Sequence, residues 1–285
     1  MKTAVLITHQ HPGAATEALS AIAAAAEKAS WRLVATAKEH EKHGKAAAKV
    51  EKVDELPPDA DLCLVAGGDG SILYALRRYA GTDVPVFGIN FGTVGFLAAA
   101  ERDELDDGLR RAFAGEFELM KLPGLEVPAL EGKEGVDTVG LNDVSFARQP
   151  QGRLAELSCR ISGELIGDVR CDGLVVATPA GSTGYNLANQ GPILAWGVEG
   201  YVVSFIAPHT LTARALVVAP SDVVEVGNAA GREPVDVAID GEHVTSLQPG
   251  ESLEVRFRGG VASLAQPSGS NFYRRIREKF GMLAH

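Results

Sequence analysis

The sequence predicts an N-terminal Rossmann-like parallel α/β domain followed by a C-terminal β-sandwich-like domain, so the fold class is α/β plus all-β. Up to residue 116, short apolar runs alternate with segments whose apolar residues recur at helical spacing, which is typical of a parallel sheet covered by helices. From residue 117 to about 264, short β-rich runs follow one another with turns between them, as in a layered all-β domain. The 285 residues are enough for two such domains.

The first domain is expected over residues 1–116 and the second over residues 117–270. In the first domain, apolar runs at 4–7, 31–35, 62–66 and 84–89 predict strands, and the patterns at 14–29 and 103–114 predict helices. The charged stretch 38–52 predicts a helix or a mobile connection. Its His40 and His43 are expected on a solvated face, because charged residues surround them and no further metal ligands cluster nearby.

In the second domain one helix is expected after Thr183, among strands at 125–130, 139–147, 155–161, 174–177, 202–206, 223–226, 235–239 and 253–257. The final stretch, 271–285, has Phe272, Ile276 and Phe280 at helical spacing beside basic residues. It predicts a closing helix that packs back on the first domain.

The overall composition excludes several classes of protein. A net charge of −10 argues against nucleic acid as a partner, because that binding depends on many Lys and Arg contacts. No apolar stretch reaches about 18 residues, so no membrane span is expected, and the short apolar start does not resemble a signal peptide. The three cysteines are an odd number, and we expect reduced thiols in a cytoplasmic protein.

The segment 65–71, Val-Ala-Gly-Gly-Asp-Gly-Ser, carries the strongest chemical signal. It joins a buried strand to a helix start, where glycines let the backbone approach a ligand and free amide groups favour phosphate. A carboxylate repels phosphate, so Asp69 suits a site that takes a proton from a hydroxyl beside a phosphate. The alternative is a tight strand–helix turn in which Asp69 caps the helix. The second glycine-rich loop, 88–95, also follows a strand and should lie on the same rim of the sheet.

Two further segments favour a ligand site. In 170–186, a buried strand leads into the small-residue turn Thr-Pro-Ala-Gly-Ser-Thr-Gly-Tyr, where Ser182 and Thr183 could cap the next helix and offer hydroxyl groups to a ligand. In 141–146, Asn142 and Asp143 interrupt a β-rich run, although both residue types are depleted in strands. An amide beside a carboxylate suits ribose hydroxyls, and the alternative is a structural bulge or turn.

Several nucleotide-binding and hydrolase signatures are absent from the sequence. There is no G-x-x-x-x-G-K-[ST] loop, no G-x-G-x-x-G after the first strand and no protein-kinase motif set, and Ser182 does not lie in G-x-S-x-G. P-loop enzymes, ordinary dinucleotide-binding domains, protein kinases and α/β-hydrolases are therefore not supported.

Taken together, these segments resemble the NAD kinase family. The ordered set is Gly67-Gly68-Asp69-Gly70, Gly88-Ile89-Asn90, Gly95-Phe96-Leu97, Asn142-Asp143, Asp172-Gly173, the 178–185 turn and Pro208-His209-Thr210-Leu211 with Arg214. The chain departs from the family at Asp143, where Glu is usual, and at Ala180 and Gly184, where Thr and Ala are usual.

The resemblance implies phosphorylation of the adenosine ribose 2′-hydroxyl of NAD, with ATP or polyphosphate as the donor, to give NADP. It implies Asp69 as the proton acceptor, Gly68 and Gly70 at the donor phosphates, and a divalent cation, Mg²⁺, that accompanies ATP. It further implies a homodimer or homotetramer in which Arg153, Arg170 and Asp172 contact NAD, some of them across the subunit boundary. The remaining residues of the implied binding set are Phe91, Asn142, Asp143, Thr183, Gly184, Tyr185, Asn186, Leu187 and Ala188.

Two other functions are open. A lipid or sphingoid-base kinase shares the glycine–Asp turn, but it should offer an apolar acceptor cleft or a membrane-binding face. A catalytically silent nucleotide-binding sensor would keep the pocket, but the intact Asp69 argues against it.

Overall fold

The computed structural model describes residues 1–9, 13–92, 95–131, 138–229 and 233–281. It divides into two compact units, Met1–Lys121 with Ala262–His285 (unit 1) and Leu122–Val261 (unit 2). Strands β7 (Glu118–Glu126) and β18 (Ser252–Gln266) contribute residues to both units.

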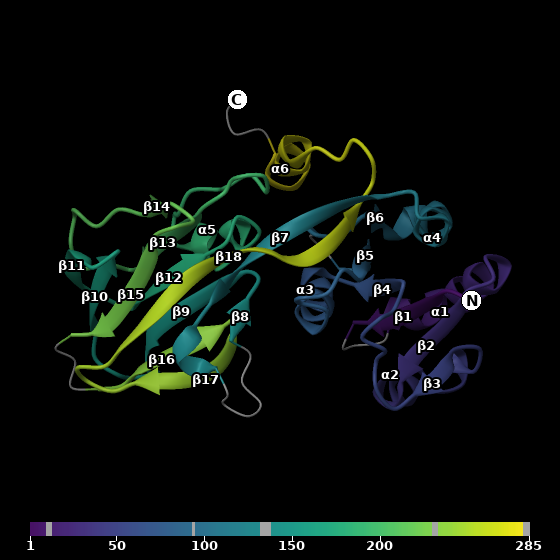
Figure 1. Ribbon diagram of the computed structural model, residues 1–285, viewed down its shortest axis with the longest axis horizontal. Helices are drawn as coiled ribbons and strands as arrows, with labels where there is room; N and C mark the ends of the chain where they lie inside the picture. The colour runs from purple at the N-terminus through teal and green to yellow at the C-terminus, as the bar shows by residue number, and fades with distance from the viewer. Residues whose placement is uncertain (10–12, 93–94, 132–137, 230–232, 282–285) are drawn as a thin grey trace. The chain divides into compact units, whose positions relative to one another are not determined.

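Unit 1 is built on a parallel sheet (Figure 1). The C-terminal end of β18 is followed across the sheet by β5, β4, β1, β2 and β3, and β6 pairs in parallel with the end of β5. The strands are β1 (Thr3–Thr8), β2 (Arg32–Thr36), β3 (Glu51–Val53), β4 (Leu62–Gly67), β5 (Pro85–Asn90) and β6 (Ala100–Glu101). The helices are α1 (Gly13–Lys28), α2 (Ala37–His43), α3 (Asp69–Arg78), α4 (Leu105–Ala114) and α6 (Phe272–Phe280), with 3₁₀ turns η1 (Gly44–Ala47) and η2 (Arg102–Glu104).

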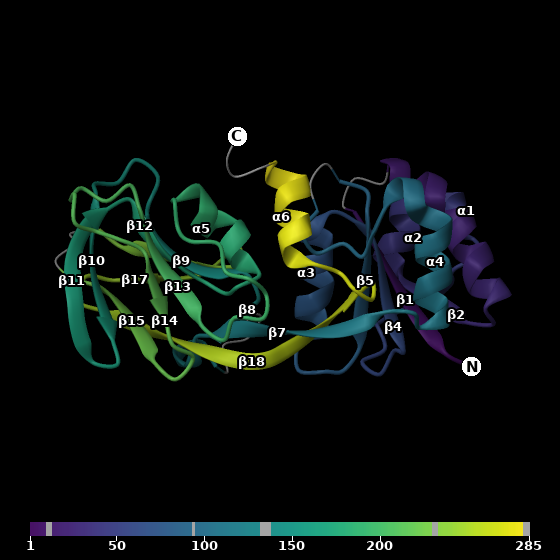
Figure 2. The same ribbon diagram turned by 90° about the horizontal axis from the view of Figure 1, so that it is seen from above.

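The central strands of unit 1 are buried on both faces, which explains their continuous apolar sequences. Leu6, Leu64 and Phe87 point to the face where α1 and α4 pack, and Trp31 meets Phe113 of α4 edge to face. Helix α3 lies on the opposite face (Figures 1 and 2), where Gly88 leaves room for Ile72.

Unit 2 is a sandwich of antiparallel strands. One sheet has the order β11-β10-β15-β18, and the other has the order β14-β13-β12-β9-β16-β17. The elements are η3 (Pro128–Leu130), β8 (Val139–Gly140), β9 (Asp143–Arg148), β10 (Ala155–Ile161), β11 (Glu164–Cys171), β12 (Gly173–Ala177), η4 (Gly181–Thr183), α5 (Tyr185–Ala188), β13 (Tyr201–Ile206), β14 (Leu216–Val218), β15 (Val223–Asn228), β16 (Val235–Ile239) and β17 (Glu242–Leu247).

Alternate residues of the two sheets of unit 2 form one hydrophobic core. Phe146 and Val176 enter it from one sheet, and Leu157 and Val226 enter it from the other. The outer face of β12 is covered as well, because Val175 and Ala177 pack with Leu194. The predicted fold class, a parallel α/β domain with an antiparallel β domain, is therefore confirmed.

The structure corrects several element predictions in unit 2. The run predicted as one strand over 139–147 is two strands, β8 and β9, separated by a bend at 141–142. Strands β11 and β17 were not predicted, because their sequences mix exposed polar residues with apolar ones. Strand β14 was not predicted either, and it is an apolar run of only three residues. Strand β18 extends well beyond the predicted 253–257.

The solvated-face interpretation of 38–52 is wrong for His43, which is 7% exposed. Thr8 at the end of β1 lies between His43 Nε2, at 2.7 Å, and Glu39 Oε2, at 2.6 Å. Thr16 Oγ1 lies 2.7 Å from His43 Nδ1. Because Thr8 Oγ1 donates to Glu39, His43 donates to Thr8 from Nε2. Burial lowers the pKa of His43, which favours the neutral imidazole, and a neutral ring then accepts from Thr16 at Nδ1. The charged sequence around His43 conceals this buried polar cluster.

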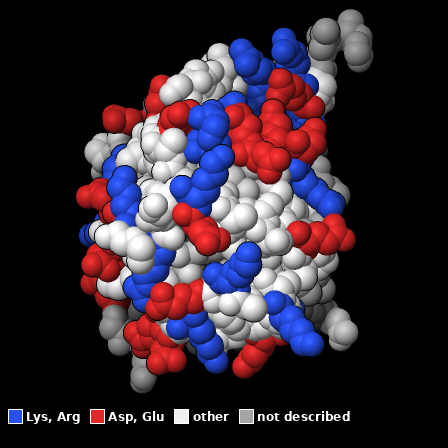
Figure 3. Space-filling view, turned by 90° about the vertical axis from the view of Figure 1, so that its right-hand side faces the viewer, with Lys and Arg blue, Asp and Glu red and all other residues white. Residues whose placement is uncertain are grey.

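The three thiols, Cys63, Cys159 and Cys171, are free and buried. Within the described residues, no helix has both the length and the apolar character needed to cross a membrane. On the face drawn in Figure 3, basic and acidic side chains are interspersed around uncharged surface.

Candidate active site

The glycine turn after β4 brings the backbone very close to its neighbours. A Cβ on Gly67 would lie 2.6 Å from the side chain of Ser71, so only glycine fits there. Gly68 is the N-cap of α3, and its carbonyl accepts from the amides of Ser71 and Ile72 at 3.0 and 3.1 Å, so the helix begins directly at the glycine turn beside Gly70. This arrangement presents a helix N-terminus, where an anion is favoured.

The second glycine loop reaches the same rim, as predicted. The amide of Phe91 donates to the carbonyl of Gly67 at 3.0 Å. A Cβ on Gly92 would lie 3.3 Å from Gly68 Cα, so glycine at both positions lets the two loops touch. Phe91 is half-buried, and the guanidinium of Arg102 lies 5.9 Å from its ring centre.

Asp69 is the first residue of α3, and its carboxylate turns toward the loop after β5. Its two oxygens accept from the amides of Phe96, at 2.7 Å, and Leu97, at 3.0 Å. Burial raises the pKa of Asp69, while these two amides and the charges of Arg275 and Lys279 act in the opposite direction. A partly desolvated carboxylate with a raised pKa is a suitable proton acceptor.

In unit 2, the bend at 141–142 is held by a residue that sequence reasoning missed. Asp240, in a left-handed conformation with φ of 48° after β16, accepts from the amides of Leu141, Asn142 and Asp143 at 2.9, 2.7 and 3.0 Å. A carboxylate that accepts hydrogen bonds from three amides fixes the backbone of residues 141–143. The available signal was Asp240-Gly241 between two apolar runs, which is a typical turn pair.

Asp143 is 7% exposed and stands beside that second carboxylate. Burial, with the charge of Asp240 as the smaller cause, raises its pKa to about 7. At neutral pH the Asp143 carboxyl therefore exists in both forms, and it can donate to or accept from a hydroxyl group.

The small-residue turn after β12 packs directly on this bend, so the structure brings two predicted motifs together. Thr178 donates from its hydroxyl to Leu141 O at 2.6 Å and from its amide to Asn142 O at 2.9 Å. A Cβ on Gly181 would lie 1.9 Å from Asn142 O, so any other residue would displace the bend.

The expectation that Ser182 and Thr183 cap the next helix is wrong. The N-cap of α5 is Gly184, and it has no side-chain cap. Ser182 Oγ donates to Pro179 O at 2.7 Å and accepts from Leu194 N at 2.9 Å, and Thr183 Oγ1 donates to Ala180 O at 3.2 Å. The Thr183 hydroxyl closes the turn on itself, and the Ser182 hydroxyl also ties the turn to Leu194.

The predicted binding residues in and next to helix α5 differ in their exposure to solvent. Gly184, Tyr185 and Ala188 are exposed, while Leu187 is half-buried. Burial raises the pKa of Tyr185, and the negative charges of Asp143 and Asp172 act in the same direction. Asn186 is fully buried, and its Nδ2 donates to Ser182 O and Pro192 O at 2.9 and 3.0 Å.

The predicted charged residues of unit 2 differ in their surroundings. Asp172 accepts from Arg148 Nε at 2.5 Å, and Arg148 is a partner that sequence reasoning missed. Arg153 and Arg170 are exposed. The amide of Arg153 donates to Glu233 at 2.8 Å, and the carbonyl of Arg170 accepts from the amide of His209 at 2.7 Å.

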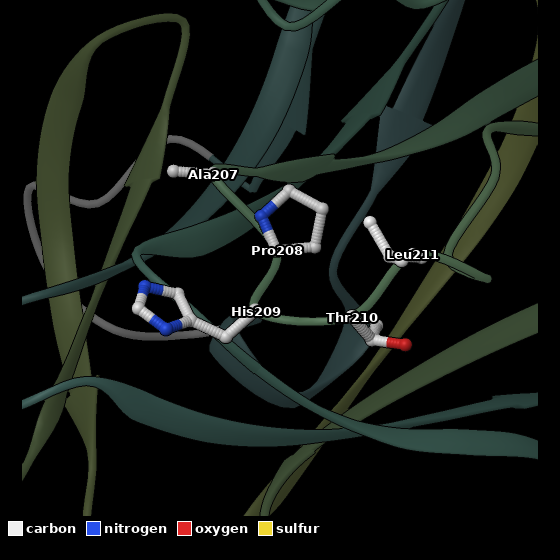
Figure 4. A pocket seen from close by; sticks show the side chains of 5 residues that line it. All are labelled: Ala207, Pro208, His209, Thr210 and Leu211. Atoms are coloured by element: carbon white, nitrogen blue, oxygen red, sulfur yellow. The ribbon is translucent and has the colours of Figure 1, made fainter.

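Two pockets adjoin these elements in unit 2. One, of about 450 Å³, is lined by residues 207–211, whose side chains fan out from a single bend of the chain (Figure 4). The other, of about 480 Å³, runs from Ala188 along the end of β13 to Arg214. Because Ala188 belongs to the predicted binding residues, the second pocket is the candidate ligand cavity beside them. In the parts of the chain that the structure describes, no group of three or more His, Cys, Asp and Glu could hold a metal ion.

Comparison with known protein families assigns the chain. The model described as "ATP-NAD kinase N-terminal domain" matches residues 14–117, and the model described as "ATP-NAD kinase C-terminal domain" matches residues 141–262. A NAD kinase of Gemmatimonas aurantiaca is 38% identical over 78% of this chain and 77% of its own length. A NAD kinase of Paraburkholderia phytofirmans is 32% identical over 98% of this chain and 93% of its own length.

Solved structures share the fold. Yeast NADH kinase complexed with NADH superposes with a TM-score of 0.86 at 20% identity, covering 100% of this chain and 89% of that one. A NAD kinase from Archaeoglobus fulgidus in complex with ATP has a TM-score of 0.74 at 23% identity, covering 99% and 98%.

These findings make the chain a phosphotransferase that acts on an alcohol group, as predicted. It belongs to the NAD kinase family.

Proposed function

We propose that this chain phosphorylates the 2′-hydroxyl of the adenosine ribose of NAD and so makes NADP, with ATP or polyphosphate as the donor. Family membership supports the acceptor, and a neighbour in fold was solved with ATP. The observation that carries the proposal is the Asp69 carboxylate, with its raised pKa, at the mouth of the glycine turn.

In the proposed reaction, the ribose 2′-oxygen attacks the terminal phosphorus of the donor as the bond from that phosphorus to the bridging oxygen breaks. Asp69 accepts the hydroxyl proton, and the leaving phosphate takes the electron pair of the broken bond. The amides around Gly68 and Gly70 stabilise the negative charge on the donor. A divalent cation such as Mg²⁺ would come bound to the phosphates of ATP, where it would neutralise part of their negative charge. Most of the rate enhancement then comes from positioning and charge stabilisation.

The NAD-binding role is proposed for the connected motifs of unit 2. Asn142 and Asp143 face ribose hydroxyls, since the Asp240 grip fixes their backbone. Asp172, oriented by Arg148, also contacts NAD. The stretch from Thr183 to Ala188 lies at the adenine. Within this stretch, Asn186 holds the turn in place rather than binding adenine with its side-chain nitrogen, because that nitrogen already donates to two carbonyls of the turn and its surroundings.

Arg153 and Arg170 are proposed to contact NAD from a second subunit of a homodimer or homotetramer, because both are exposed on their own subunit. Light scattering coupled to size exclusion tests the assembly. A monomer that has full activity would contradict it.

One assay tests the reaction and its base together. The purified chain is incubated with NAD, Mg²⁺ and either ATP or polyphosphate, and NADP is measured with an NADP-specific dehydrogenase. A general base contributes about 10²–10⁴-fold, so Asp69→Asn should lose at least ~100-fold in turnover and still bind NAD. The control is Asp59→Asn, which removes an exposed carboxylate of unit 1. Near-normal turnover of the Asp69 variant would refute the role of this residue.

A further inference from the structure

The chain segment 96–98 in unit 1 is gripped on both of its polar edges. Its amide edge faces the active site, where Phe96 N and Leu97 N donate to the two oxygens of Asp69 at 2.7 and 3.0 Å. These two bonds are the contacts that orient the Asp69 carboxylate, so whatever holds the segment also holds the proposed base.

The carbonyl edge of the same segment is bound from the C-terminal end of the chain. Arg275 Nη1 donates to Phe96 O and, at 2.7 Å, to Ala98 O. Gln266 Nε2 donates to the carbonyl between them, Leu97 O, at 2.8 Å. Arg275 Nη2 also donates to Gln266 Oε1 at 2.6 Å, so the two side chains act as one clamp on three successive carbonyls.

One peptide unit links the guanidinium to the carboxylate. The carbonyl of Phe96 and the amide of Leu97 belong to the same peptide group, which accepts from Arg275 at one end and donates to Asp69 at the other. Hydrogen bonds in such a chain polarise one another, and a charged donor strengthens the effect. Arg275 therefore strengthens the bond to Asp69 through the peptide group that they share.

Helix α6 holds Arg275 in this position. Its first turn is capped by Asn271, whose side chain accepts from the amides of Tyr273 and Arg274 at 2.9 and 3.2 Å. At its other end, the Phe280 ring packs on Phe96, with ring centres 5.1 Å apart, and Lys279 donates to Glu101 at 2.9 Å.

The charges that act on Asp69 come from this helix. Arg275 and Lys279 both stabilise the charged form of Asp69, and the two amides act in the same direction against burial. Arg275 itself faces the charges of Asp69, Glu101 and Glu278. Because Lys279 is paired with Glu101, Arg275 is the cation whose bonds lead to the carboxylate.

We propose that Arg275 is a positioning residue of the phosphoryl transfer, which orients the Asp69 carboxylate and keeps it ionised through the Phe96–Leu97 peptide. This inference rests on the proposed function of Asp69 as the base. The sequence of α6 contains several basic residues and does not distinguish Arg275 from the others. Its contacts in the folded structure do.

The first test compares the pH profile of kcat/KM for NAD in the wild type, Arg275→Met and Arg277→Met. Arg277 is an exposed arginine of the same helix, so its variant controls for loss of charge from α6. Loss of a nearby cation makes a carboxylate harder to ionise, so the acidic limb of Arg275→Met should move up by about half to one pH unit. Its kcat at pH 7 should fall about tenfold or more, because the base is no longer held in place. The KM for NAD should change less than about threefold, because uniform binding is not altered. An acidic limb that is the same in all three proteins overturns the proposal.

The second test needs no substrate. Amide hydrogen exchange of the segment 96–98 should be about tenfold or more faster in Arg275→Met than in the wild type, and unchanged in Arg277→Met. Equal exchange in the wild type and Arg275→Met overturns the clamp. If the wild type makes no NADP, the proposed function fails, and this exchange measurement still decides the clamp separately.

Should Arg275→Met fail to fold, Arg275→Lys replaces it. An ammonium group keeps the positive charge but cannot reproduce the fork that reaches two carbonyls and Gln266. Faster exchange at 96–98 with a smaller shift of the acidic limb is then expected, and unchanged exchange contradicts the proposal.

Discussion

Replacing Asp143 by Asn should make unit 2 less sensitive to alkaline pH. Asp143 is 7% exposed, and burial next to Asp240 raises its pKa from an ordinary 3.8 to about 7. Between these two values the unfolded chain has released the proton and the folded chain has kept it. The unfolded state therefore binds fewer protons, and the stability of the wild type falls as pH rises through this window.

The size of the effect follows from the displacement of the pKa. About three pKa units correspond to roughly 4 kcal/mol of destabilisation once pH exceeds the folded value. Roughly 1.5 kcal/mol of this is already present at pH 5, because the unfolded carboxyl is ionised there. Between pH 5 and pH 8 the wild type should therefore lose about 2.5 kcal/mol more than Asp143→Asn.

The assay is urea unfolding at pH 5 and pH 8, followed by tryptophan fluorescence. The two tryptophans of the chain lie in different units, so a Trp31→Phe background leaves Trp196 as the reporter of unit 2. Asp168→Asn, which removes an exposed carboxylate of β11, is the matched control and should keep the slope of the wild type. Parallel pH dependence of the wild type and Asp143→Asn would refute the argument from burial.

Two further predictions concern other positions. Gly181→Ala should destabilise unit 2 by about 1–3 kcal/mol and raise the KM for NAD, because the new Cβ would lie 1.9 Å from Asn142 O. The control is Gly167→Ala, whose new Cβ would meet nothing within 4 Å. It should be close to neutral in the same urea-unfolding and kinetic measurements. Burial lowers the pKa of His43 below its ordinary 6.5, so the unfolded state binds the proton first and unit 1 should lose stability as pH falls below about 6.5. In a Trp196→Phe background that leaves Trp31 as the reporter, this slope should disappear in His43→Gln, and a slope that persists would rule out His43 as its cause.

The sequence was sufficient for the parts of the fold that depend on local pattern. The strands around Leu64 and Phe87 are continuous apolar runs, since they are buried on both faces. The glycine turn at 67–70 was recognisable because its steric demand is set by residues within a few positions of one another. A bulge or turn at Asn142 and Asp143 was the predicted alternative to a ligand-binding pair, because Asn and Asp are poor strand formers.

Local sequence pattern did not predict structure correctly where a residue is buried by segments distant in the chain. His43 lies in a charged stretch, but Thr8 and Thr16 come from other elements and bury it. Strand β11 pairs with β10 although its own sequence has little alternation, because the hydrogen bonds of a neighbouring strand decide whether such a segment is extended.

The sequence by itself determined the family, the two kinds of sheet and the motif residues that the proposed chemistry needs. Only the tertiary structure decided what holds those residues in place: Asp240 on the bend at 141–143, Arg148 on Asp172, and Arg275 on the segment that binds Asp69. These contacts join residues far apart in the chain, and their strength comes from burial and hydrogen-bond geometry. Neither is visible in the order of amino acids, because both arise only when the chain has folded.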